Sequence, residues 1–572
     1  KKKKKKTAQM ENPATAAFAG RLPEMRGEFG DWQTGYDFAC AVCRKLKDMG
    51  AAPEVILEPT CGLGNFIRAG LAIFDTITDV YGIEIYKPYL DELRRSLVVK
   101  ENQRIHLYHE DIFAFDFSEI KKQLEGKNVL ILGNPPWVTN SELGKNGSTN
   151  LPQKYNYRGT KGIEAITGKG NFDIAESICN LLIENFASNE GTRIALLVKN
   201  SVVKNILIHQ RPQGYFISHV CQYAFDAKKE FDVSVSASLF SCTIGKEKTD
   251  ICRYYDFYTG AFQKSYGWKN DRFVSDIEEY DKAAMIDGVS ELVWRSGVKH
   301  DCSKVMELIV RSGRYENGFR ETVDVEPVCI YPLIKSSDIG NGFSGEVRKY
   351  IVLPHRSLAE PNSAMKQRTP LTYAYFEKYG QLLDGRKSSI YKGKPRFCVF
   401  GLGDYSFKPY KVVVSSFYKN IIFSLVSPIN GQSVMLDDTC YMLGFDNWAF
   451  AKITHHLLNS PVVMQFISAL CFTDAKRVIN CELLMRIDLS KVLEIIGDVT
   501  IEGVTASEID AYRVFINGKE LPGQNDLFEG QRLNAKDMPF QGQPSKEPAI
   551  STFPRAKALK KHLCDVQLSF DY

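Results

Sequence analysis

The first 250 residues alternate short apolar runs with segments of helical periodicity, and this alternation constrains the fold more than any other feature. Such alternation is typical of parallel strands joined by crossover helices. The expected strands are 55–57, 80–85, 105–108, 129–132, 194–198 and 233–244, and the clearest expected helices are 64–74, 88–97 and 174–186. The sequence therefore predicts a doubly wound, Rossmann-like α/β domain, which binds ligands beyond the carboxyl ends of its strands.

Three boundaries divide the rest of the chain. Residues 1–25 begin with six lysines and lack an initiating Met, so we interpret them as a tag or flexible N-terminus. The α/β domain is expected over 26–250. The alternation then fades into mixed strands and loops, which predicts a mixed α+β domain over 251–490. Residues 491–572 are polar and contain several glycines and prolines, and we expect them to form a C-terminal extension.

The charge of the chain is concentrated in one region. In total 73 Lys and Arg oppose 68 Asp and Glu, and six of the lysines are the N-terminal run. Between residues 331 and 420, fifteen Lys or Arg oppose six Asp or Glu, and fifteen Tyr or Phe are interleaved with them. Basic and aromatic side chains together suit phosphate contact and base stacking. This region is the expected polyanion-binding surface; the alternative is a solvated basic face over an aromatic core.

Membrane insertion, secretion and metal binding are not expected. No run approaches the roughly 18 apolar residues that a membrane helix needs. The fourteen cysteines are scattered and suit a reducing cytosol, so a cytoplasmic location is expected. Cys40 and Cys43 form a CxxC without a second pair at zinc-finger spacing, which is typical of one apolar helix face.

A glycine-rich loop and an acidic strand end predict a nucleoside-type ligand. Glu58-Pro59-Thr60-Cys61-Gly62-Leu63-Gly64-Asn65-Phe66 follows the first expected strand and opens a helix. Glycines there let the backbone approach a ligand. Ile67 stands where the dinucleotide fingerprint would have its third glycine, which weakens an oxidoreductase interpretation. Glu84 ends the next strand, where a carboxylate can accept both hydroxyls of a ribose.

The next two strand ends predict a site for a planar ring with an amino group. The third strand ends in Glu110-Asp111-Ile112, and Asp111 can accept an exocyclic amine. The fourth ends in Gly133-Asn134-Pro135-Pro136-Trp137. The Asn134 amide oxygen and the Pro135 carbonyl can accept hydrogen bonds from an NH₂ group, and Trp137 offers a flat surface for stacking. A rigid turn followed by a core Trp is the alternative interpretation of the last motif.

The motifs EPTCGLGNF, GIEI, EDIF and GNPPW, in this order at strand ends, resemble those of gamma-class DNA amino-methyltransferases that use S-adenosylmethionine. The resemblance covers about residues 26–246 and includes a segment around Thr34, whose family counterpart contacts the methionine part of the cofactor. It implies catalytic residues Asn134, Pro135, Pro136 and Trp137, with Phe172 against the target ring. It implies a cofactor site formed by Thr34, Glu58, Thr60, Cys61, Gly62, Gly64, Glu84, Ile85, Asp111, Ile112 and Asn134.

The same resemblance makes the second domain a target-recognition domain for double-stranded DNA. The residues expected to contact DNA are Lys335, Ser336, Ser337, Arg348, Lys349, His355 and Arg356. The implied reaction is methylation of adenine N6 after the base has flipped out of the duplex. The resemblance implies a restriction-modification system, and the C-terminal extension contains no clear PD…(D/E)xK nuclease cluster. The cognate restriction endonuclease is therefore expected to be a separate polypeptide.

Other functions remain open at this point. Cytosine-N4 methylation uses the same geometry, although Asn134 before the prolines favours adenine. An rRNA adenine-N6 methyltransferase would use the same chemistry. A protein-glutamine methyltransferase would not need a large basic second domain. A non-catalytic DNA-binding module with a vestigial methyltransferase fold is the non-enzymatic alternative, and the intact motifs argue against it.

Overall fold

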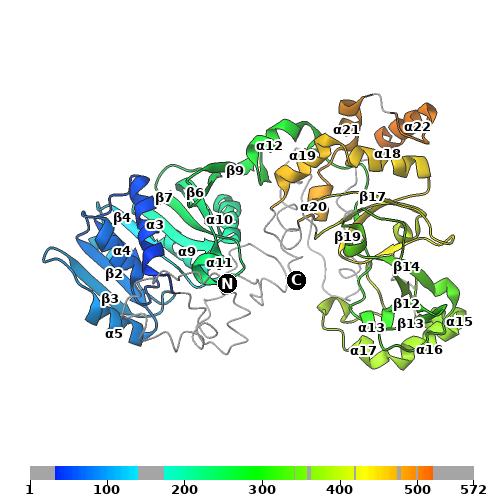
Figure 1. Ribbon diagram of the computed structural model, residues 1–572, viewed down its shortest axis with the longest axis horizontal. Helices are drawn as coiled ribbons and strands as arrows, with labels where there is room; N and C mark the ends of the chain where they lie inside the picture. The colour runs from blue at the N-terminus through cyan, green and yellow to red at the C-terminus, as the bar shows by residue number, and fades with distance from the viewer. Residues whose placement is uncertain are drawn as a thin grey trace, which may run out of the picture. The chain divides into compact units, whose positions relative to one another are not determined.

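The computed structural model describes residues 33–138, 173–340, 342–356, 362–417, 420–472, 478–497 and 500–518. The chain divides into two compact units, residues 1–278 and 279–572, which are described separately (Figure 1). The expected N-terminal tag, Phe172 and residues 519–572 lie outside the described residues. Within the described part, no helix is long and apolar enough to cross a bilayer.

Unit 1 is built on a ten-stranded sheet with the order β10-β9-β8-β6-β7-β5-β4-β1-β2-β3. The strands that pair in parallel at one side are β1 (Val55–Glu58), β2 (Asp79–Glu84), β3 (Arg104–His109), β4 (Val129–Gly133) and β5 (Arg193–Lys199). The chain order reverses at β1, which lies between β4 and β2. The predicted α/β fold with its first five strands is confirmed.

Helices join these strands and pack in pairs. They are α3 (Tyr36–Asp48), α4 (Asn65–Ile73), α5 (Lys87–Ser96), α6 (Ser118–Gln123), α9 (Ile174–Asn185), α10 (Asn200–Gln213) and α11 (Ala227–Phe231). α3 packs beside α4, and α9 packs beside α10. The helices predicted at 64–74, 88–97 and 174–186 are therefore confirmed as α4, α5 and α9.

The first unit extends beyond the predicted boundary at residue 250. β6 (Ile217–Phe225) and β7 (Ala237–Ile244) pair antiparallel, and β7 also pairs antiparallel with β5. β8 (Ile251–Asp256) then pairs in parallel with β6, and β9 (Phe262–Lys269) and β10 (Arg272–Val274) complete the edge. These edge strands mix exposed and buried positions, so they lack the continuous apolar runs by which the earlier strands were recognised.

Unit 2 combines two sheets with peripheral helices, so it has the mixed α+β architecture that the sequence predicts. One sheet has the order β11 (Arg295–Ser296), β19 (Cys440–Phe445), β16 (Tyr410–Ser415) and β17 (Ser424–Val426). The other has the order β13 (Arg314–Glu316), β12 (Glu307–Arg311), β15 (Lys349–Val352), β14 (Ile330–Ile334) and β18 (Met435–Leu436). Its described core includes one cluster of buried apolar side chains around β12, β14 and β15 and another around β16 and β19.

The helices of unit 2 gather at its two ends in Figure 1. At one end lie α12 (Ile277–Ala283), α18 (Trp448–Leu458), α19 (Pro461–Leu470), α20 (Cys481–Leu484), α21 (Leu489–Ile496) and α22 (Ala506–Asn517). At the other lie α13 (Ser303–Met306), α15 (Asn362–Arg368), α16 (Pro370–Lys378) and α17 (Gly380–Asp384). α14 (Ser336–Ile339) follows β14 directly.

The described part of the expected C-terminal extension belongs to unit 2. α22 begins with a capping box. Glu508 N donates to the Thr505 side chain, and Thr505 N donates to the Glu508 side chain. Its Tyr512 is fully buried, and the Tyr512 hydroxyl lies 2.9 Å from Thr454 Oγ1 of α18. The Tyr512 ring packs 5.6 Å from that of Phe450. The sequence beyond residue 490 looked like a tail because its apolar residues are few, but one helix of it completes a buried contact.

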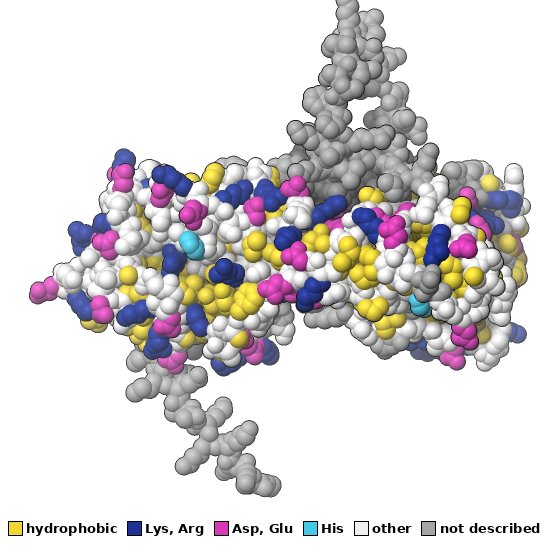
Figure 2. Space-filling model, turned by 90° about the horizontal axis from the view of Figure 1, so that it is seen from above, with side chains coloured by type: hydrophobic (Ala, Val, Ile, Leu, Met, Phe, Trp, Pro, Cys, Tyr) yellow, Lys and Arg dark blue, Asp and Glu magenta, His cyan; other side chains and the backbone are white. Residues whose placement is uncertain are grey.

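Charged side chains of both signs are interspersed on the face shown in Figure 2. This distribution agrees with the near balance of acidic and basic residues in the sequence outside the N-terminal lysines.

Candidate active site

A pocket lies at the carboxyl ends of β1 to β4, and all four strand-end motifs line it. Its empty space, including the open mouth, is about 930 Å³. The predicted site residues that line it are Thr34, Glu58, Thr60, Cys61, Gly62, Glu84, Ile85, Asp111, Ile112, Asn134 and Pro136. The structure thus brings together motifs that are spread over a hundred residues of sequence.

The loop between β1 and α4 is shaped by two glycines. Gly62 and Gly64 have φ angles of +50° and +73°, in the region that side chains rarely adopt. A Cβ atom on Gly64 would lie 2.4 Å from Leu93 Cδ1, so this position also lacks room. Gly64 does not line the pocket; it precedes the first residue of α4 and allows the sharp turn into the helix.

Glu84 fastens the loop through its carboxylate. Gly62 N donates to Glu84 Oε2 at 2.7 Å, and Tyr86 N donates to Glu84 Oε1 at 2.7 Å. Cys61 N donates to the Ile83 carbonyl at 2.9 Å, so β2 holds the loop by backbone as well. Each carboxylate oxygen has a second lone-pair site, which allows it to accept a ligand hydroxyl in addition. Glu84 therefore has a structural role in the loop, and its contact to a ribose stays a prediction.

Two side chains that sequence analysis missed attach the Thr34 segment to this loop. Asn65 Nδ2 donates to the Thr34 carbonyl at 2.8 Å, and Leu63 N donates to Gln33 Oε1 at 3.3 Å. The hydroxyl oxygens of Thr34 and Thr60 are buried and have no hydrogen-bond partner among the described residues. Because buried hydroxyls are normally satisfied, two such groups in one pocket suit a polar ligand. Asn65 lies in the glycine-rich motif, but the sequence alone assigned no role to its side chain or to that of Gln33.

The charge of the pocket favours a cationic ligand. The described residues that line it include four carboxylates, Glu58, Glu84, Glu110 and Asp111, and no Lys, Arg or His. Burial raises the pKa of Glu58 well above its ordinary value, against the opposing effect of the hydrogen bond from Ile67 N. A pyrophosphate would be repelled here, whereas the sulfonium and ammonium groups of S-adenosylmethionine would be attracted. The residues present therefore fit the cofactor that the resemblance implies.

The Asn134-Pro135-Pro136-Trp137 turn closes one side of the pocket. Asn134 and Pro136 line it, while Pro135 is buried beside them. Trp137 points elsewhere: its side chain is 5% exposed, and its Nε1 donates to the Leu197 carbonyl of β5 at 3.0 Å. The Trp137 ring packs 5.1 Å from that of Phe231, in an aromatic cluster. The structure shows an anchor for the turn, and stacking of Trp137 on a target base stays a prediction.

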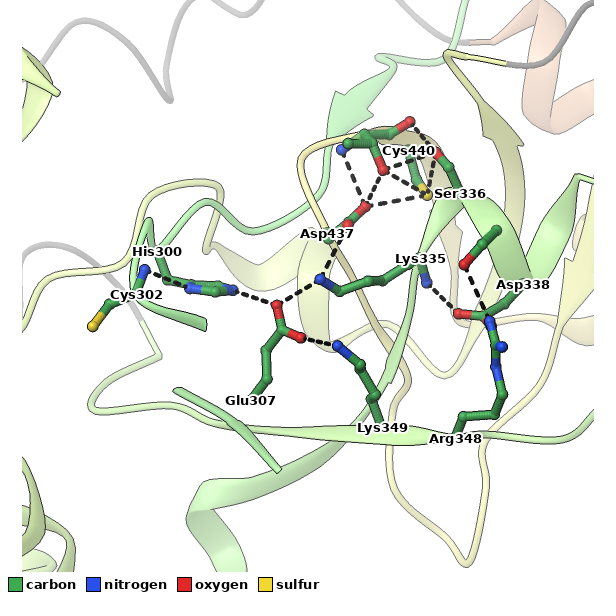
Figure 3. A network of polar contacts seen from close by, with 12 residues as sticks. His300, Cys302, Glu307, Lys335, Ser336, Asp338, Arg348, Lys349, Asp437 and Cys440 are labelled. Carbon is green, nitrogen blue, oxygen red and sulfur yellow. Dashed lines mark hydrogen bonds and ion pairs between the residues drawn. The ribbon is translucent and has the colours of Figure 1, made fainter. Parts of the chain in front are cut away.

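In unit 2, the predicted DNA-contacting lysines surround a carboxylate that sequence analysis did not consider (Figure 3). Lys335 Nζ and Lys349 Nζ each lie 2.5 Å from a different oxygen of Glu307. His300 Nε2 lies 3.4 Å from Glu307 Oε1. Burial alone would raise the pKa of Glu307, but the hydrogen bonds from these three side chains outweigh it and lower the pKa to about 2. The two lysines therefore have an internal counter-charge.

The other predicted DNA contacts also have partners within unit 2. Ser336 Oγ donates to the Thr439 carbonyl at 2.7 Å, and Arg348 Nη2 donates to Ser337 Oγ at 3.1 Å. Arg348 Nε also donates to Asp338 Oδ1 at 2.8 Å (Figure 3). His355 is buried and accepts from Val399 N at 3.2 Å. Arg356 is exposed, with its guanidinium 4.2 Å from the centre of the Phe407 ring. A local count of charges does not reveal these pairings.

Replacing Glu307 by Gln is expected to lower the stability of unit 2 by about 2–4 kcal/mol, because removing one partner leaves buried charges uncompensated. The Lys335 and Lys349 side chains are 27% and 40% exposed and can regain water, which limits the loss. The stabilisation should be complete above pH 4.5 and should be lost as the pH falls through about 2, because the pKa is lowered on folding.

Hydrogen exchange of the β12 and β15 amides at pH 7 measures this effect within unit 2. Glu377→Gln is the matched control, since Glu377 pairs with Arg396 at the surface and its side chain is 41% exposed. The control should change stability by less than about 1 kcal/mol. Equal exchange in the Glu307 variant and the unsubstituted protein would contradict the expectation.

Comparison with known proteins identifies the family. The chain is 37% identical over 471 residues to the type II methyltransferase M.NspV of Nostoc sp. (strain ATCC 29411 / PCC 7524), and the match covers 82% of this chain and 98% of that protein. The chain belongs to the type II methyltransferases. Because the match is longer than unit 1, the similarity of this methyltransferase to its relative extends into unit 2. No protein-family model matches the chain.

Among solved structures, this methyltransferase resembles the type IIL restriction-modification enzyme MmeI in complex with DNA, with a TM-score of 0.45 and 12% identity, covering 90% of this chain and 76% of that one. The type IIG restriction endonuclease BpuSI has a TM-score of 0.34 and 12% identity, covering 91% and 68% of the two chains. A modification subunit of a putative type I restriction enzyme from Vibrio vulnificus YJ016 has a TM-score of 0.29 and 16% identity, covering 48% and 61%.

Proposed function

We propose that this type II methyltransferase transfers a methyl group from S-adenosylmethionine to N6 of an adenine in double-stranded DNA, as the modification enzyme of a restriction-modification system. One observation carries the proposal: the acidic pocket and the Asn134 turn share one cavity. A cationic methyl donor held at β1 to β3 would then lie next to a site built to accept an amine. The cognate endonuclease would be a separate polypeptide.

The cofactor would be held by side chains that already lie in place. Glu84 would accept the ribose hydroxyls, and Asp111, whose Oδ1 accepts from Phe113 N at 3.0 Å, would face the adenine amine. The buried Thr34 hydroxyl would bond the methionine part. When bound, S-adenosylmethionine supplies a methyl group activated by its sulfonium. The acidic side chains around the pocket, Glu84, Glu110 and Asp111, would favour that charge.

Asn134 would orient the acceptor amine. Its Oδ1 and the Pro135 carbonyl would accept the two hydrogens of the NH₂ group, which leaves the nitrogen lone pair directed along the line of transfer. Fixing two reactants in this way can contribute about 7–11 kcal/mol, so no strong general base is required. Burial raises the pKa of the Cys61 thiol well above its ordinary value, which disfavours the thiolate that a nucleophilic cysteine needs.

The target adenine would have to leave the DNA stack, which costs a few kcal/mol. Contacts from unit 2 to the duplex would offset this cost. Trp137 would hold the turn rigid through its bond to Leu197, and any stacking on the base would need a face of its ring that the aromatic cluster leaves open. Phe172, the other predicted ring contact, lies outside the described residues.

Transfer of labelled methyl from S-adenosylmethionine to unmethylated duplex DNA, followed by mass spectrometry of the nucleosides, tests the proposal. N6-methyladenine is the expected product. N4-methylcytosine would retain the mechanism and overturn the choice of base. Transfer to rRNA or protein alone would overturn the choice of substrate, and cofactor binding without transfer to any acceptor would indicate a vestigial enzyme.

A further inference from the structure

The hairpin formed by β12 and β13 carries two arginines at its tip. Their ion-pair partners differ from those of the basic residues that were expected to contact DNA. Lys335, Lys349 and Arg348 are occupied by carboxylates within unit 2 (Figure 3). At the tip of the hairpin, by contrast, Arg311 and Arg314 are both exposed. Arg311 Nε lies 3.7 Å from Glu316 Oε2, and Arg314 has no ion-pair partner among the described residues. Among the described residues, the charge of Arg314 is therefore not neutralised within the fold.

The turn makes this tip narrow. Ser312 and Gly313 connect the strands and have φ angles of +48° and +74°. Positive φ at both central residues is the signature of a two-residue turn whose twist matches that of the strands. Such a turn continues the two-stranded ribbon to its end without a wider loop. A two-stranded ribbon has a cross-section that the DNA major groove, about 12 Å wide, accepts.

The two arginines lie directly opposite one another. Arg311 pairs with Arg314 as the last pair of the antiparallel ladder, so both side chains leave the same face of the ribbon. Like charges placed directly opposite destabilise a strand pair. Glu316 offsets this repulsion on the Arg311 side only. Two adjacent guanidinium groups on one face suit a ligand with paired acceptors.

The base of the hairpin is firmly held. β12 begins at Glu307, so the carboxylate that binds Lys335 and Lys349 fixes the strand where it leaves the sheet (Figure 3). Tyr315 of β13 packs with its ring 5.1 Å from that of Tyr350 on β15. The lysines expected to touch DNA thus act as positioning residues for the hairpin.

We propose that the β12–β13 hairpin inserts into the major groove of the target DNA and that Arg311 and Arg314 read guanine edges there. This inference rests on the proposed function, because it assumes that the chain methylates a specific DNA sequence. Arginine can bond guanine O6 and N7 with both arms of its guanidinium, and a lysine cannot reproduce that geometry. The hairpin would then set part of the recognition sequence.

The test compares methylation patterns of the full chain and its variants. Each is expressed in a bacterial host that lacks DNA methylation, and the modified positions are mapped by sequencing native DNA. Purified proteins are then assayed on duplexes carrying the mapped site or single-base variants of it. R314A is expected to lower the discrimination at one G·C pair roughly 5- to 150-fold, with R311A acting at a neighbouring pair.

Two further variants separate base reading from charge and from folding. R314K keeps the charge, so it should restore binding strength and fail to restore discrimination. R513A removes an equal charge from α22, where Arg513 pairs with Asp510 at 3.4 Å, and should leave the site unchanged. The melting temperature of R314A should not fall, because the substitution relieves a like-charge pair at an exposed tip.

The outcomes separate this inference from the proposed function. Suppose that the unsubstituted chain methylates a specific site and that R311A and R314A discriminate against single-base variants of that site equally well. This result would overturn the hairpin assignment alone. A uniform loss at all sequences, or full rescue of discrimination by R314K, would also overturn it, since either result indicates phosphate contact. No DNA methylation by the unsubstituted chain would overturn the proposed function and this inference together.

Discussion

Asn134→Ala is expected to lower the rate of methyl transfer by a factor on the order of 10³ while leaving the affinity for S-adenosylmethionine within about threefold, which is the pattern for a group that acts on the reacting centre. Asn134 follows β4 directly and lines the same pocket as Glu58 and Glu84. Its amide oxygen would accept one hydrogen of the target amine, and alanine offers no acceptor. The amine would then rotate freely, and its lone pair would lose its alignment.

Single-turnover methylation of DNA and calorimetric titration with the cofactor measure the two quantities separately. Asn185→Ala is the matched control: Asn185 is half-buried at the end of α9, where its Nδ2 donates to the Leu181 carbonyl at 2.9 Å, and it lies outside the pocket. Asn134→Asp keeps an acceptor oxygen and should retain more activity than the alanine variant. Turnover of Asn134→Ala at the unsubstituted rate would remove Asn134 from the mechanism.

Glu84→Gln is expected to weaken cofactor binding by roughly 100-fold or more. The glutamine can accept a hydrogen bond through one oxygen, but its NH₂ group would face either Gly62 N or Tyr86 N, each of which now donates to the carboxylate at 2.7 Å. A charged hydrogen bond contributes about 1.5–3 kcal/mol, and an unsatisfied buried N–H costs about 1–3 kcal/mol more. The pocket would also lose one of its negative charges.

Titration with S-adenosylmethionine and with its product S-adenosylhomocysteine, which lacks the sulfonium charge, measures the loss of affinity. Comparing the two ligands separates the effect of the lost charge from the other effects. The loop distortion and the ribose contact should affect both ligands, and the lost charge should affect only the sulfonium. Glu119→Gln on α6, with a side chain 75% exposed, is the matched control and should bind normally. Equal affinities in the Glu84 variant and the unsubstituted protein would show that the ribose is held elsewhere.

The sequence predicted the parallel half of unit 1 well because those strands are buried on both faces. β1, β2 and β4 consist of buried residues throughout, so each appears as a short apolar run between helical segments. The motifs at the ends of these strands were expected to meet in space, because parallel strands place their carboxyl ends on one edge of the sheet. The pocket lined by Glu58, Glu84, Asp111 and Asn134 was therefore predictable from one-dimensional spacing.

The edge of that sheet was not predictable in the same way. β8 and β9 mix exposed and buried residues irregularly, and the pairing of β8 with β6 and of β9 with β8 depends on contacts between segments that the sequence does not mark. The same applies to α22, which is held by the burial of Tyr512 against Phe450. β8, β9 and α22 form because other elements of the fold offer them a surface to pair with or pack against. That surface exists only in the folded chain.

The sequence by itself determined the α/β class, the position of the pocket and most of the polar residues that line it, because strand runs and strand-end motifs are local properties of the chain. Only the tertiary structure decided the roles of individual charged and aromatic side chains. Trp137 bonds to Leu197, which is sixty positions away in sequence, and Lys335 and Lys349 share Glu307 across three strands. Whether a side chain faces a ligand or an internal partner depends on what the fold places within about 3 Å of it, and that distance is set by packing.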